Sequence, residues 1–345
     1  MAGAWEQANY ARATVQPRRV TPTRVYRFYS GGALIGALRG QPEEDGPFPE
    51  DWVGSVTEAS NPGRDEPEAG LSRVADGPLL RDLIEEEPEA WLGRNHLERF
   101  GTSTGLLVKI LDAGQRLPVH AHPGRTFARR HLGSQFGKTE AWIVLDTRAE
   151  ASEVWIGLRE PVERGHFREW IERQDSAALL SSLNHLPVRA GDVVYVPAGA
   201  PHAIGAGALI AELQEPTDLS IVAEWSGFPI EPADAHLGIG WELALEAFDL
   251  TPRQPALGLP EEAREFFWAD DLPEPAGRFG ILLVLAGEGE LAGEQAQAGD
   301  AFAVPAAVEE LEVSDDLRVL RCLAPDPSSP RPPSPRAASS RRGRP

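Results

Sequence analysis

Two short stretches of this chain carry histidines at a spacing that suits a single metal ion. Residues 114–122 read GQRLPVHAH and contain His120 and His122, and residues 191–202 read GDVVYVPAGAPH and end on His202. Residues i and i+2 of a strand project from the same face, so His120 and His122 can point into one cavity. Neutral imidazole is the commonest metal ligand in proteins, and three imidazoles with a carboxylate suit a divalent first-row ion such as zinc. The pattern predicts a metal centre that supports chemistry.

The carboxylate is predicted to come from Glu140, which lies in the phrase GKTEAW just before an apolar run. Lys138 stands two residues earlier, so a strand would place its ammonium group on the same face, beside the metal. Among the 33 Lys and Arg residues, only Lys109 and Lys138 are lysine, which makes both candidates for positions that need a compact ammonium group. Lys109 lies in the apolar run LLVKIL and points either into a cavity or, as an edge-strand charge, into water.

The other histidines and the cysteine content narrow the choice of ligands. A single histidine in a loop or helix is more often an ordinary core or surface residue than a ligand. We interpret five histidines in that way: His96, His131, His166, His185 and His236. The one cysteine, Cys322, excludes an intrachain disulfide framework and a cysteine-based zinc site, so any zinc must use histidine and carboxylate.

Composition limits both the fold and the partners. A chain of 345 residues favours two packed units, and its 34 Gly and 31 Pro favour many short strands joined by tight turns. The net charge of −20 repels nucleic acid and anionic membranes, so neither is an expected partner. The chain shows no signal-peptide core and no run of some 18 apolar residues, so we expect a cytoplasmic protein.

The order of elements along the chain can be outlined. Residues 25–59 are expected to enter a sheet, 79–92 to form two short helices around a proline, and 106–111 to begin the metal-bearing strand. Gly299 to Pro305 repeats the GDxxxVP pattern of Gly191 to Pro197, which predicts a second unit; it has Glu309 or a neighbour in place of His202 and no metal. The predicted parts are an N-terminal extension (1–24), a metal-binding domain (25–235) with a helical insertion at about 161–183, a connecting segment (236–275), a second unit (276–323) and a disordered basic tail (324–345).

The two histidine stretches fit GxxxxxHxH and GxxxxxPxGxxH, and in this they resemble the paired motifs of the cupin superfamily. The resemblance implies a mainly β protein made of two cupin (jelly-roll β-barrel) units with helical insertions. Three further features point to one family within the cupins. They are the carboxylate 18 residues beyond His122, the insertion before the second motif, and the phrase VPAGAPHAIGAGALIAELQEPTD. From about Val25 to Leu323 the chain resembles the type I phosphomannose isomerases, zinc enzymes that interconvert mannose 6-phosphate and fructose 6-phosphate.

The resemblance implies a role for several positions and a ligand for the pocket. It implies one Zn²⁺ per chain, a small sugar or sugar phosphate as substrate, and a monomer or weak homodimer. The family's ligands fall on His120, where the family has Gln, and on His122, Glu140 and His202. Its site lysine falls on Lys138, and a pocket glutamate considered for proton transfer falls on Glu212. On this resemblance either Glu212 or Lys138 moves the proton, and Lys138 steadies the developing oxyanion.

Two departures leave the substrate open. The chain has Val222 where the family carries an arginine, and Pro118 where it carries a serine that helps to hold phosphate. An isomerase of a non-phosphorylated sugar therefore stays as an alternative. So does a cupin dioxygenase, because three histidines and a glutamate also hold iron or manganese, and so does a sugar-binding cupin without turnover.

Overall fold

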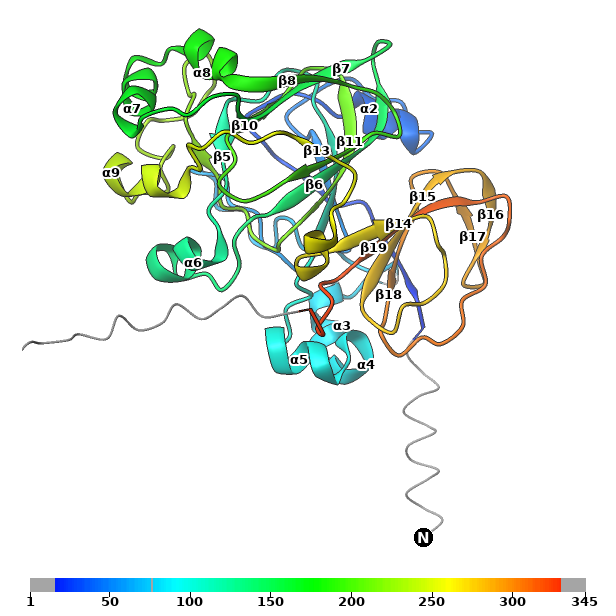
Figure 1. Cartoon of the computed structure of the whole chain (residues 1–345). Helices are drawn as coiled ribbons and strands as arrows, with labels where there is room; N and C mark the ends of the chain where they lie inside the picture. The colour runs from blue at the N-terminus through cyan, green and yellow to red at the C-terminus, as the bar shows by residue number, and fades with distance from the viewer. Residues whose placement is uncertain (1–15, 76, 330–345) are drawn as a thin grey trace, which may run out of the picture.

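The computed structural model describes residues 16–75 and 77–329. The fold is mainly β with helical insertions, as expected, and consists of a larger and a smaller unit (Figure 1). The smaller unit lies at one side of the larger one, and helices α7 (Arg164–Arg173), α8 (Ser176–Ser182) and α9 (Trp241–Ala244) lie at the opposite side. Residues 1–15 of the expected extension and 330–345 of the expected tail lie outside the described residues.

The larger unit contains two antiparallel sheets. The first has seven strands in the order β13 (Ala256–Leu257), β9 (Val193–Val196), β6 (Glu140–Thr147), β11 (Ala208–Gln214), β4 (Leu107–Asp112), β3 (Glu50–Val53), β2 (Arg24–Val25). The second has five strands in the order β12 (Ile221–Val222), β5 (His120–Ala121), β10 (His202–Ile204), β7 (Ser152–Leu158), β8 (Leu183–Val188).

Side-chain alternation decides what each sheet places on its inner face. On β11, Leu209, Ala211 and Leu213 pack outward into the largest core cluster, so Glu212 faces inward. On β5 and β10 the outward residues are Ala121 and Ala203, which pack with insertion residues such as Phe167 and Leu179. The helical insertion therefore supports the strands that carry histidines from behind, and the imidazoles face the interior.

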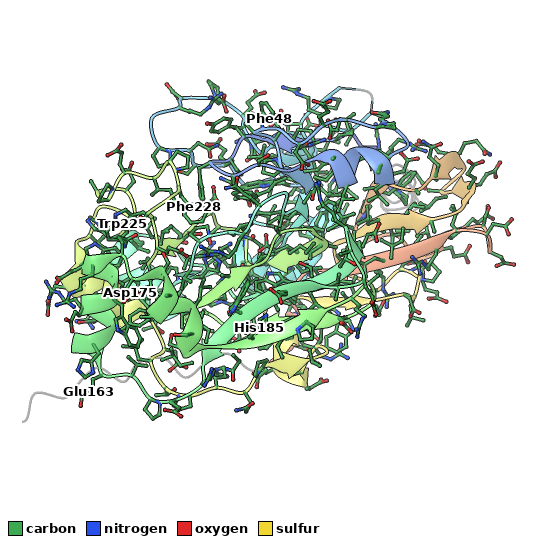
Figure 2. All side chains as sticks on the ribbon, turned by 90° about the horizontal axis from the view of Figure 1, so that it is seen from above. Phe48, Glu163, Asp175, His185, Trp225 and Phe228 are labelled. Carbon is green, nitrogen blue, oxygen red and sulfur yellow. The ribbon has the colours of Figure 1, made fainter. Side chains whose placement is uncertain are left out.

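Short helices cover the outer faces. The expected break at 79–92 is confirmed: α3 (Leu80–Glu86) and α4 (Pro88–Leu92) are separate helices, and Pro88 occupies the first turn of α4, where the missing N–H costs nothing. In the insertion, the Asp175 side chain accepts a hydrogen bond from the Ala178 N–H at 2.9 Å and caps α8; Figure 2 shows Glu163 and Asp175 in this insertion. The remaining helical segments are α2 (Ala33–Leu38), α5 (Arg94–Phe100), α6 (Arg125–Phe127), a π-helical turn (Ala128–Leu132) and two 3-10 turns (Leu245–Ala247, Glu261–Glu265).

The smaller unit is a five-stranded sheet with an added hairpin. Residues 18–20, expected within the N-terminal extension, form its edge strand and pair with β18. The strand order is β1 (Arg18–Val20), β18 (Ala301–Val304), β15 (Gly280–Ala286), β19 (Arg318–Leu323), β14 (Trp268–Asp270), and the hairpin is β16 (Glu288–Leu291) with β17 (Glu294–Gln297).

The repeated GDxxxVP pattern builds the same turn in both units. Gly191 and Gly299 have φ values of +94° and +87°, a region that favours glycine. The following aspartate accepts a hydrogen bond from a backbone N–H three residues earlier, at 2.8 Å for Asp192 and 2.9 Å for Asp300. The pattern therefore encodes a strand entry, and the histidine that follows it in the larger unit is a separate feature; Glu309 is exposed.

A membrane span is not found among the helices of the described residues, since none has the length and apolar character to cross a bilayer.

Candidate metal centre

The three predicted imidazoles meet between the two sheets of the larger unit. His120 on β5 and His202 on β10 are direct partners in the antiparallel ladder, and His122 follows β5 by one residue. The ligand atoms of the three histidines all lie within 4.8 Å of one another, and all three side chains are buried. Glu140, the first residue of β6, reaches them from the facing sheet.

Hydrogen bonds to backbone carbonyls orient each ring. Nδ1 of His120, His122 and His202 lies 2.8 Å from the carbonyl oxygens of Pro118, Leu219 and Ala200, respectively. With Nδ1 as the donor, the Nε2 lone pair of each ring faces the cavity, which is the arrangement that second-shell partners give to metal-binding imidazoles. Nε2 of His202 is buried and has no hydrogen-bond partner among the described residues.

Glu140 lies within reach of two of the rings. Its carboxylate oxygens lie 3.0 Å from His122 Nε2 and 3.3 Å from His202 Nε2. Lys138 Nζ lies 3.1 Å from the same carboxylate and 2.8 Å from His122 Nε2. The predicted position of Lys138 two residues before Glu140 thus brings its ammonium group to the site, although β6 begins only at Glu140.

The protonation of these groups favours cation binding. Burial is the main cause that lowers the pKa of His202, and burial with the Lys138 charge lowers the pKa of His122 to about 3. Burial and the neighbouring imidazoles hold the pKa of His120 well below 6.5. Burial opposes the charge on Glu140, but Lys138 together with His122 and His202 outweighs burial and holds the pKa of Glu140 well below 4.5. Three neutral imidazoles and one carboxylate are the protonation states that a divalent metal requires.

A buried charge network lies beside the centre. Lys109 on β4 is the register partner of Glu212 on β11, and Lys109 Nζ lies 3.4 Å from Glu212 and 3.6 Å from Glu50. Because β4 lies between β11 and β3, the edge-strand interpretation of Lys109 is wrong and its charge points into the cavity. Burial is the main cause that raises the pKa of Glu212 to about 7. The charge of Lys109 lowers this pKa and the charge of Glu140 raises it.

Sequence reasoning missed Glu50, which holds this network in place. Its carboxylate accepts hydrogen bonds from Tyr29 Oη at 2.5 Å, Trp52 Nε1 at 2.7 Å and Arg27 Nε at 2.9 Å. Burial opposes its charge, but Arg27 and Lys109 outweigh burial and lower the pKa of Glu50. The available signal was an acidic residue two positions before Trp52 in a strand, which places both side chains on one face.

One expectation about the strands was wrong. Residues 106–111 do not begin the metal-bearing strand: β4 ends at Asp112, and His120 lies on β5 in the other sheet. The chain leaves β4 in a turn in which Gly114 comes so close to Gly31 and Asp45 that a Cβ atom would meet both within 3 Å. The chain then crosses to the second sheet, so the segment between Lys109 on β4 and His120 on β5 joins the two sheets.

The centre opens into a cavity of about 370 Å³, within the range of small-molecule sites. His120, Lys138, Glu140 and Glu212 line its inner end. Pro118 and Val222 also line it, and Val222 on β12 is the register partner of His120.

The comparisons with known proteins cover different lengths of the chain. No family model matches the sequence. Over 153 residues the chain is 41% identical to the mannose-6-phosphate isomerase of Streptococcus mutans, a match covering 43% of this chain and 45% of that protein. A mannose-6-phosphate isomerase of Bacillus subtilis is 37% identical over 142 residues, 38% of this chain and 40% of that protein. The chain thus spans less than half the length of these curated relatives.

Solved structures match almost the whole fold. The mannose 6-phosphate isomerase of Bacillus subtilis aligns with a TM-score of 0.68 at 22% identity and covers 89% of this chain and 99% of its own. A mannose 6-phosphate isomerase bound with zinc and yttrium aligns with a TM-score of 0.65 at 16% identity, covering 90% of this chain and 100% of its own. The chain is therefore related in sequence to the mannose-6-phosphate isomerases over the matched segment and has the phosphomannose isomerase fold over about nine-tenths of its length.

Proposed function

We propose that this protein is a zinc-dependent aldose–ketose isomerase of the mannose-6-phosphate isomerase type. The observation that carries the proposal is the convergence of three buried imidazoles and Glu140 beside a cavity that Glu212 and Lys138 also line. The curated relatives bear the name of this activity, and a structural neighbour is described with bound zinc.

The residues present fit a zinc ion. The donor set of three imidazole nitrogens and one carboxylate is a usual one for zinc, and the buried His202 Nε2 without a hydrogen-bond partner is an atom that a cation would satisfy. We assign His120, His122, Glu140 and His202 as its ligands. When bound, zinc supplies a Lewis acid that polarises the two sugar oxygens between which the carbonyl moves.

Isomerisation moves a proton between C1 and C2 of the open-chain sugar through an enediol. We assign this transfer to Glu212, because a carboxylate with a pKa of about 7 takes up and returns a proton readily near neutral pH. Lys138 is assigned to steady the negative charge that develops on the sugar oxygen, since its ammonium group lies beside the ligand carboxylate. Lys109 holds Glu212 from the next strand.

Turnover of two sugars tests the proposal. Purified, zinc-loaded protein is incubated with mannose and, separately, with mannose 6-phosphate, and ketose formation is followed together with exchange of the C2 proton for solvent deuterium. We expect ketose from at least one sugar and its loss in the Glu212→Gln variant. If zinc-loaded protein forms no ketose from either sugar, the proposal is contradicted. If the Glu212→Gln variant is as active as the unmodified protein, the assignment of Glu212 is wrong.

Metal content provides a second test. We expect purified protein to hold close to one zinc per chain. Iron or manganese at that stoichiometry, with oxygen consumption in place of ketose formation, would favour the dioxygenase alternative, because the same ligand types serve those ions.

Location and partners complete the proposal. We place the enzyme in the cytoplasm as a monomer or weak homodimer that binds neither nucleic acid nor membranes. The net charge of −20 supports the exclusion of polyanionic partners.

A further inference from the structure

The cavity is poorly suited to a phosphate group, because each of the four Lys and Arg side chains that line it already faces a carboxylate. Arg27 is buried and lies 2.9 Å from Glu50 and 3.0 Å from Asp218. Lys109 is shared between Glu50 and Glu212.

The remaining two basic side chains are also paired, Lys138 in the buried site and Arg64 at the surface. Lys138 pairs with Glu140 at the metal end of the cavity. Arg64 pairs with Glu66, and its guanidinium group stacks 3.8 Å above the ring of Tyr26. A sugar phosphate entering this cavity would have to break one of these ion pairs to gain a cation of its own.

Carboxylates without a cationic partner lie at the mouth of the cavity. Glu231 and Asp234 follow β12, line the cavity and are exposed. Within residues 16–75 and 77–329, neither has a salt-bridge partner. Like charges held close together repel one another, so this rim disfavours a dianion and tolerates a neutral molecule.

The lining of the cavity is well suited to hydroxyl groups. Glu231 and Asp234 offer carboxylate oxygens that accept O–H donors, and Ser220 both donates and accepts. Tyr26 and Phe28 add aromatic surface, while Pro118 and Val222 add apolar surface. Many acceptors, some apolar area and no uncommitted cation match the chemistry of an uncharged polyol.

We propose that the substrate is an uncharged aldose, which carries a free hydroxyl group where a sugar phosphate carries its phosphate. The inference rests on the proposed isomerase function and names the substrate class of that same cavity. The reaction involves C1 and C2, which are the same in mannose and mannose 6-phosphate, so the metal end does not select between the two. Selection falls to the outer half, where Glu231 and Asp234 lie.

The test compares mannose with mannose 6-phosphate on the full, zinc-loaded chain. We expect kcat/KM for mannose to exceed that for mannose 6-phosphate by about tenfold or more, the ratio that corresponds to roughly 1.4 kcal/mol. The double variant Glu231→Gln with Asp234→Asn should shift this ratio toward mannose 6-phosphate by a similar factor. The control is Glu160→Gln with Glu163→Gln, which removes the same charge from exposed positions of the helical insertion and should leave the ratio unchanged.

Binding separates failure of this inference from failure of the proposed function. Thermal unfolding of the zinc-loaded protein is recorded with mannose, mannose 6-phosphate and inorganic phosphate, and we expect mannose alone to raise Tm. Tighter binding of mannose 6-phosphate than of mannose, or a higher kcat/KM for it, overturns the inference while leaving the isomerase function intact. Binding of mannose without ketose formation overturns the function and leaves the preference of the cavity for an uncharged sugar supported.

Discussion

The buried carboxyl group of Glu212 makes a quantitative prediction about pH. In the unfolded chain its pKa is close to 4.5, and in the folded, metal-free protein burial raises it to about 7. Between these two values the folded protein keeps a proton that the unfolded chain has released, so stability falls as pH rises. The linkage is about 1.4 kcal/mol per pH unit, which gives a loss of about 3 kcal/mol across the interval for this single group.

Replacing Glu212 with Gln removes this dependence, because the amide does not ionise. We expect the unfolding free energy of unmodified protein minus that of Glu212→Gln to fall by about 3 kcal/mol between pH 5 and pH 8, measured by chemical denaturation of chelator-treated protein. Leu213→Val on the same strand is the control, since neither side chain titrates and its difference from unmodified protein should not change with pH. A Glu212→Gln difference that is also constant over this range would refute the reasoning, because it would mean that Glu212 stays ionised in the folded protein.

Three further predictions concern the ligands, the buried network and the insertion. His202→Ala should weaken zinc binding by more than the roughly 10- to 100-fold that is typical of losing a residue that only supports a ligand. The control is His185→Ala, on strand β8 near the surface (Figure 2), which should keep the zinc affinity of unmodified protein. Equal zinc affinity of the two variants in a chelator competition would contradict the ligand assignment. Glu50→Gln should destabilise the protein by about 3 kcal/mol or more near pH 7, because it leaves the buried charges of Arg27 and Lys109 without their shared partner; an unchanged urea midpoint would argue against that network. Asp175→Ala should cost about 1 kcal/mol through loss of the α8 cap and should speed amide exchange in that helix first, while exchange that is faster everywhere to the same degree would show that the cap is not a local feature.

Much of the site could be predicted because it depends on local spacing. His120 and His122 stand two apart, and the alternation of a strand is enough to place both on one face. The GDxxxVP pattern fixes a turn through Gly191 and Asp192, so the approach to His202 also follows from nearby residues.

What could not be predicted depends on sheet pairing across long distances. Lys109 meets Glu212 only because β4 and β11 are neighbours, and Glu50 joins them only because β3 lies on the other side of β4. The error about the metal-bearing strand has the same origin, since nothing in residues 106–122 indicates that the chain changes sheets after Asp112. Local patterns give the inward face of a strand, whereas the neighbouring strand is decided by packing of the whole unit.

The N-terminal strand β1 has a consequence for how the two units can form. It completes the sheet of the smaller unit by pairing with β18, so residues 18–20 lie beside residues 301–303. The largest core cluster likewise mixes Val20, Val53 and Val108 with Ile281 and Ala303. During synthesis residues 18–20 can therefore pair only after residues 301–303 have been made, and a cut through the connecting segment would not release two independent domains. The smaller unit therefore joins the two ends of the described chain. Because its strands are far apart in the sequence, we expect contact order, more than local propensity, to limit the folding rate.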